Sequence, residues 1–151
     1  MVLGDARLKL AEAPNNEYGM IVGEAFSSDA IPVHLMTREA VDMYLQKLKS
    51  DGVLVMHISN RHLRLEPVVG DLAQDRGLVC YSQYDGDLEN PQSPYPEYKL
   101  ASNFTVLARN EADLGSVPSD DRWHPCMTSD DPENDVWTDD FSNLLSTLVW
   151  D

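Results

Sequence analysis

The feature that most constrains the fold is an alternation of short apolar runs with segments of helical spacing. Residues 53–58 (VLVMHI) are almost continuously apolar, which is typical of a strand covered on both faces. Similar runs of strand length occupy residues 18–23, 78–84 and 103–109. Strands that alternate with helices predict an α/β fold with a doubly wound, mostly parallel sheet and flanking helices.

Four segments have helical spacing, and the second has the clearest pattern. Thr37 can accept a hydrogen bond from the first turn of this helix. Val41, Tyr44 and Leu48 then recur on one apolar face, and Gly52 is placed to end the helix. The other three helices are predicted around residues 8–11, 66–76 and 138–148.

The charge of the chain limits its partners. The 151 residues fit one domain and include 26 acidic against 11 basic residues, for a net charge of −15. Such a surface repels nucleic acid and attracts cations, including polyamines, although a solvated acidic surface needs no ligand at all. No apolar run approaches the roughly 20 residues of a membrane helix, and the first residues do not resemble a signal peptide. We therefore expect a cytoplasmic protein that binds neither membranes nor nucleic acid.

The cysteines and histidines predict neither a disulfide nor a metal site. Cys80 lies in a predicted strand, where a free cysteine acts as a small apolar residue, and Cys126 lies in a long polar segment. Two cysteines without a secretion signal do not indicate a disulfide framework. His57 and His62 straddle a loop, and His124 is isolated beside Cys126, so the spacing suits no metal.

Several segments match one family pattern, in order along most of the chain. They are residues 4–7 (GDAR), 18–32 (YGMIVGEAFSSDAIP), 34–35 (HL) with 37–40 (TREA), 52–60 (GVLVMHISN) and 137–145 (WTDDFSNLL). Together they resemble the spermidine synthase (polyamine aminopropyltransferase) family, most closely the bacterial branch fused to a membrane transporter. The resemblance implies that residues 1–151 form a single truncated domain with a partial, Rossmann-like class I methyltransferase fold. Its strands would be the fourth to seventh of that fold, in the spatial order 4-5-7-6.

The resemblance also implies roles for individual residues. The Gly-Asp pair of the family contacts the adenine of decarboxylated S-adenosylmethionine, which assigns cofactor binding to Asp5 and Ala6; a helix N-cap is the alternative for Asp5. The acid that deprotonates the attacking amine corresponds to Glu24, where related sequences have Asp. Ser28 and Asp29 match the loop that holds the diamine, and for Asp29 the alternative is a turn residue.

The eight glycines include no Gly-x-Gly turn, which the backbone needs to approach the tail of a nucleoside. Two functions therefore remain open. The first is a transferase of the aminopropyltransferase type, incomplete as a single chain, with a polyamine and an adenosyl thioether as ligands and no covalently bound cofactor. The second is a non-catalytic module that binds small cations or other chains. The strand containing Ile21 would form an open sheet edge, which predicts a homo-oligomer or a partner chain there.

Overall fold

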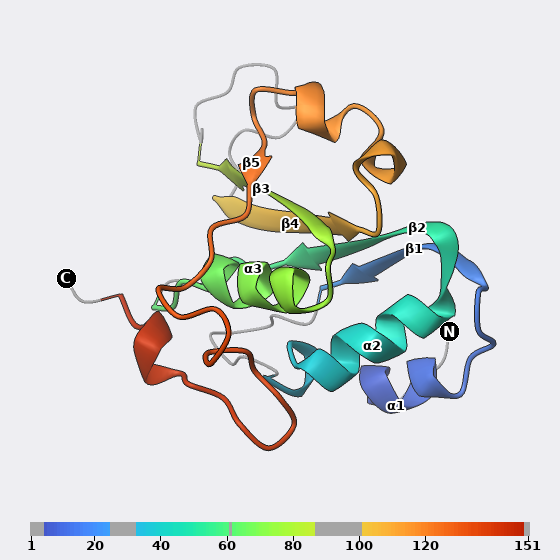
Figure 1. Cartoon of the computed structure of the whole chain (residues 1–151), viewed down its shortest axis with the longest axis horizontal. Coiled ribbons are helices and arrows are strands. Elements are labelled where there is room, and N and C mark those ends of the chain that lie inside the picture. The colour runs from blue at the N-terminus through green and yellow to red at the C-terminus, as the bar shows by residue number, and fades with distance from the viewer. Residues whose placement is uncertain (1–4, 25–32, 61, 87–100, 150–151) are drawn as a thin grey trace.

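The computed structural model describes residues 5–24, 33–60, 62–86 and 101–149. Its one sheet has five strands in the order β1-β2-β4-β3-β5 (Figure 1). The strands are β1 (Tyr18–Gly23), β2 (Leu48–His57), β3 (Val79–Asp85), β4 (Ser102–Ala108) and β5 (His124–Pro125). The α-helices are α1 (Ala6–Ala11), α2 (Arg38–Lys47) and α3 (Glu66–Asp75). The short 3-10 helices are η1 (Val33–Leu35), η3 (Glu111–Leu114), η4 (Val117–Ser119) and η5 (Leu145–Thr147). None of the described helices is long and apolar enough to cross a membrane.

The predicted order of the strands is confirmed, but the prediction of a mostly parallel sheet is wrong. β1 and β2 are parallel, whereas β4 is antiparallel to both β2 and β3, and β5 is antiparallel to β3. The reversed β4 makes both of its interfaces antiparallel, and β5 runs opposite to β3, so among the described strands only β1 and β2 pair in parallel. The fold is α/β with a mixed sheet. Local patterns did not predict the strand directions because these depend on which strands become neighbours.

The second predicted helix begins as expected and ends early. Thr37 caps α2, since its Oγ1 accepts the N–H of Ala40 at 3.2 Å. The helix ends at Lys47, and the chain enters β2 at Leu48 instead of continuing to Gly52. Leu48 is fully buried and faces Tyr18 at the start of the β1–β2 ladder. Its apolar side chain therefore fits the helical spacing but belongs to the sheet.

The two faces of the sheet have different covers. Helices α1, α2 and α3 lie on one face (Figure 1), where Leu54 and Met56 of β2 are buried with Trp137 in the main core. Trp137 anchors the packing of this core, since it is only 1% exposed. On the opposite face, Val53 and Val55 pack into a smaller cluster that includes residues of η3 and η4. This smaller cluster does not extend to β1, where Met20 and Val22 are exposed.

The predicted helix over residues 138–148 is wrong. That segment contains only the short η5, and it is held by backbone contacts to distant parts of the chain. The N–H of Arg38 donates to the carbonyl of Trp137 at 2.8 Å, and Leu63 forms a bridge with Leu148. Three of the apolar residues that would have formed a helix face remain exposed: Phe141, Leu144 and Leu145. A short helix needs such a face buried, because its own hydrogen bonds do not stabilise it in water.

The expectation of two unpaired cysteines is also wrong, because Cys80 and Cys126 form a disulfide. Pairing of β5 with β3 brings them together, and the N–H of Cys126 donates to the carbonyl of Cys80 at 3.0 Å. Sequence reasoning dismissed the pair because two cysteines without a secretion signal do not indicate a disulfide framework, and the 46 positions between them gave no local signal of contact. Disulfides are rare in cytosolic proteins, so this one weighs against the cytoplasmic location, which stays a prediction.

Candidate functional site

A cavity of ≈ 270 Å³ lies at the carboxyl ends of β1 and β2, against α1 and α2. Glu24, the residue that follows β1, forms part of its wall. Most of the remaining wall is apolar and includes Leu10, Ile21, Leu35, Met36, Leu54 and Met56. The carboxyl ends of parallel strands are the usual place for ligands in α/β sheets, so this cavity is the candidate site.

The structure brings two of the predicted site residues to this cavity. Glu24 is exposed to solvent, and Ala6 of α1 belongs to the same wall. A carboxylate beside apolar side chains can attract a cation while its neighbours hold an alkyl chain. Ser28 and Asp29, the predicted diamine-binding residues, lie outside the described residues.

Asp5 is the N-cap of α1. Its side chain accepts the N–H of Leu8 at 3.0 Å and thereby caps α1, as the alternative interpretation of this residue predicted. A second carboxylate oxygen of Asp5 lies 3.5 Å from Nε2 of His34. Asp5 is not among the residues of the cavity wall. The N-cap is confirmed, and the contact with adenine stays a prediction.

Among the described residues of the cavity wall, Tyr44 is the other ionisable one. Its hydroxyl donates to the carbonyl of Leu35 at 3.1 Å, and the side chain is 7% exposed. Burial raises the pKa of Tyr44 to about 12. Tyr44 is therefore neutral at physiological pH, and its hydroxyl proton is already donated to the carbonyl of Leu35. Of the described residues in the cavity wall, Glu24 is therefore the one that carries a charge.

A second, polar cavity of ≈ 490 Å³ surrounds an ion pair between Arg7 and Asp139. Two guanidinium nitrogens of Arg7 donate to the two carboxylate oxygens of Asp139, each at 2.7 Å. The hydroxyl of Thr37 also donates to Asp139 at 2.7 Å, and both donors hold the pKa of that carboxyl below its usual range. This arrangement joins α1 and α2 to the segment after Trp137. Asp139 thus pairs with Arg7 and Thr37 and does not begin an α-helix, although one was predicted around residues 138–148.

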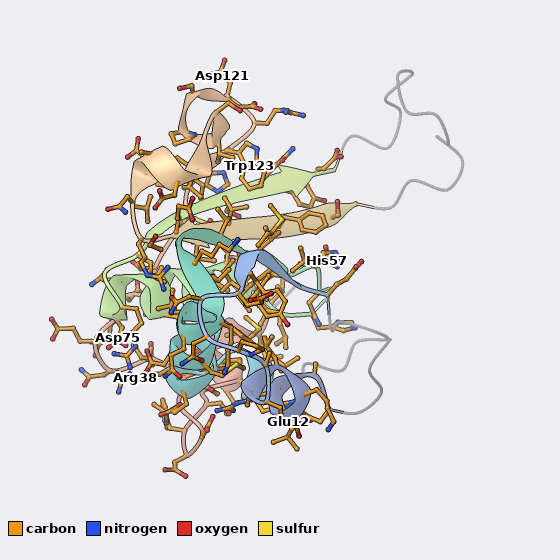
Figure 2. The ribbon with its side chains drawn as sticks, turned by 90° about the vertical axis from the view of Figure 1, so that its right-hand side faces the viewer. Glu12, Arg38, His57, Asp75, Asp121 and Trp123 are labelled. Carbon is orange, nitrogen blue, oxygen red and sulfur yellow. A yellow bond between two sulfur atoms is a disulfide. The ribbon has the colours of Figure 1, made fainter. Side chains whose placement is uncertain are left out.

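Sequence reasoning missed a polar cluster at the end of β2. Nε2 of His57 lies 2.7 Å from Oγ of Ser59, which also accepts the N–H of Asn103 at 2.7 Å. The imidazole of His57 stacks on Phe104, with ring centroids 4.6 Å apart. Figure 2 labels His57 at this end of the sheet, where the β1–β2 pairing closes with Gly23, the residue before Glu24, opposite Met56. The only sequence signal was a His-x-Ser pattern closing an apolar strand.

The remaining histidine and cysteine side chains of interest have structural partners. Nε2 of His124 lies 3.1 Å from Oε1 of Glu66, and Cys126 is in the disulfide. Glu66 also accepts the N–H of Met127 at 3.0 Å. Within the described part of the chain, no group of three or more His, Cys, Asp or Glu side chains could hold a metal ion.

Comparison with known proteins gives a remote structural likeness. No family model matches the sequence, and no curated protein matches it. The fold is similar to a crystal structure of MnmC2 from Aquifex aeolicus, with a TM-score of 0.46 and 16% sequence identity. The match covers 88% of this chain and 39% of that protein, so this chain spans well under half of its length. At this distance the likeness concerns the fold alone and carries no argument about function.

Proposed function

We propose that this protein is a spermidine-synthase-like domain that binds a small alkylammonium ligand, such as a diamine, and does not transfer an aminopropyl group by itself. The observation that supports this function is the position of Glu24 in the otherwise apolar wall of the cavity at the ends of β1 and β2. In this proposal the sheet is part of a class I methyltransferase fold.

The properties of the cavity favour a short alkyl amine over a nucleoside. An ammonium group would lie beside Glu24, and each methylene buried against the apolar wall would contribute about 0.8 kcal/mol. Because Glu24 is exposed, its ion pair with the ligand would add little, and the methylenes would supply most of the affinity. Pockets for drug-sized ligands have volumes of roughly 300–1,000 Å³. A cavity of ≈ 270 Å³ suits a smaller molecule.

A transferase is the second candidate, because Glu24 and Ala6 belong to one cavity wall. In this mechanism Glu24 takes a proton from the attacking amine as the new C–N bond forms and the C–S bond of the sulfonium breaks. The leaving group is methylthioadenosine, the adenosyl thioether that Asp5 and Ala6 would contact. Decarboxylated S-adenosylmethionine would supply the aminopropyl group. Two features favour binding over catalysis by this chain: the sequence has no Gly-x-Gly turn, and Glu24 is longer than the family's Asp.

Calorimetric titration with putrescine tests the proposal. We expect weak binding by the unmodified chain and about threefold weaker binding by Glu24→Gln, which keeps the shape of the side chain and removes its charge. Glu17→Gln is the matched control, since Glu17 is an exposed carboxylate at the other end of β1. Equal putrescine affinity in the two variants, or no heat with the unmodified chain, would contradict the proposal.

A parallel titration with methylthioadenosine distinguishes the two candidates. Asp5→Ser keeps a residue that can cap α1 while removing the carboxylate. Nucleoside binding that is lost in Asp5→Ser would favour the transferase. Absence of nucleoside binding together with binding of putrescine would favour the alkylammonium site.

A further inference from the structure

The outer strand of the sheet presents apolar side chains to solvent. β1 is at the end of the strand order, and no described strand pairs with its outer edge. Met20 is 57% exposed and Val22 is 54% exposed. Their register partners on β2 are Val53 and Val55, so the four side chains continue one face of the sheet. This face is the one that η3 and η4 cover farther along the sheet.

The cover ends before it reaches β1. Val53 and Val55 are partly buried because they pack against the smaller apolar cluster on this face, which contains Val106 and Leu114. Met20 and Val22 lie one strand farther out and do not belong to that cluster. An added strand would extend the sheet through the edge of β1 that no described strand occupies, and its side chains on the same face would pack beside Met20 and Val22.

Both ends of β1 are acidic. Glu17 precedes the strand and Glu24 follows it, and both side chains are exposed. No described ion pair involves either carboxylate; Lys9 is paired with Glu12 at 2.9 Å, and Lys47 donates to Ala13 and Asn15. An added strand therefore meets an apolar centre with a negative charge at each end.

We propose that β1 pairs with an extended segment of a partner protein, in which alternating apolar residues are flanked by Lys or Arg. The backbone of the segment would extend the sheet, its apolar side chains would contact Met20 and Val22, and its flanking cations would pair with Glu17 and Glu24. Charge at both ends makes the site compatible with either strand direction. A segment with cations at only one end would pair with only one of the two carboxylates, Glu17 or Glu24.

A second copy of this chain fits the edge less well. Antiparallel pairing of two β1 strands brings the end of one strand that begins at Tyr18 beside the end of the other that closes at Gly23. This arrangement brings the Glu17 end of each copy toward the Glu24 end of the other, and like charges close together on neighbouring strands are destabilising. Each chain also carries a net charge of −15, which opposes self-association. The charges therefore favour a basic partner.

Binding of two short peptides tests this inference. The first is the blocked peptide Lys-Val-Thr-Val-Thr-Val-Thr-Lys, and the second has Glu in place of both Lys residues. By fluorescence anisotropy at low salt, we expect the chain to bind the Lys peptide about tenfold more tightly than the Glu peptide, with the difference reduced by added salt. Val22→Lys should weaken binding of the Lys peptide about tenfold, because it places a cation on the apolar face.

The controls separate this result from unfolding and from self-association. Leu8→Lys is the matched control, since Leu8 is 66% exposed on α1, away from the edge of β1, and should leave peptide binding unchanged. Circular dichroism verifies that both variants fold. Equal affinity for the two peptides, or no binding of either, would overturn the inference. A stable dimer in sedimentation that Val22→Lys dissociates would also overturn it and identify a second copy as the occupant.

Discussion

Reduction of the Cys80–Cys126 disulfide should lower the stability of the fold by an amount that follows from the length of the loop it closes. The sequence separation is 46, and the loop-closure relation gives about 4 kcal/mol at 25 °C for a loop of that length. Domains of this size have total stabilities of roughly 5–15 kcal/mol, so this is a large share. The melting temperature should fall by about 10 °C.

The cost should arise mainly in the unfolded state, because other contacts hold the same segment in the folded protein. After reduction, the N–H of Met127 still donates to Glu66 at 3.0 Å and the N–H of Ser129 to Asp71 at 2.9 Å. The reduced protein should therefore keep its near-ultraviolet circular dichroism at 25 °C while unfolding at a lower urea concentration.

Urea unfolding with and without a phosphine reductant measures the difference. A Cys80→Ala and Cys126→Ala double variant is the control: it should match the reduced protein and not respond to the reductant. Either of two results would refute the reasoning. The first is unfolding free energies of the oxidised and reduced protein that agree within about 1 kcal/mol. The second is the presence of two reactive thiols in the native protein before reduction.

Two further predictions concern the packing of α3 and the wall of the candidate site. A Cβ on Gly70 would lie 2.0 Å from the carbonyl oxygen of Met127, so Gly70→Ala should lower the free energy of unfolding in urea by about 2 kcal/mol. Gly19→Ala is the control, because a Cβ on Gly19 would meet no atom within 4 Å and should not cause this overpacking. An equal effect of the two substitutions would contradict the close approach. Because burial raises the pKa of Tyr44 from 10.0 to about 12, the folded state holds this proton more tightly, and stability should be complete below pH 10 and fall by roughly 2 kcal/mol as the pH rises to 12. Tyr44→Phe should remove this part of the pH dependence, and a variant that follows the parent curve between pH 10 and 12 would refute the assignment.

The sequence by itself determined most of the elements, because their patterns are local. Residues 18–23 form β1 as predicted, since an apolar run of that length needs only a sheet to join. Thr37 caps α2 because its hydroxyl reaches the first turn within its own segment. Glu24 and Ala6 were assigned from a family resemblance, and the structure brings them to one cavity. Their predicted roles remain to be tested.

Only the tertiary structure decided the features that depend on distant neighbours. The reversed direction of β4, the pairing of Cys80 with Cys126 and the ion pair of Arg7 with Asp139 each join residues far apart in the chain. The segment over residues 138–148 has helical spacing, yet it forms no α-helix among its described residues. Its apolar positions find no surface that would bury them, and without burial the spacing contributes little free energy. Local patterns state what a segment can form, and packing decides which form is stable.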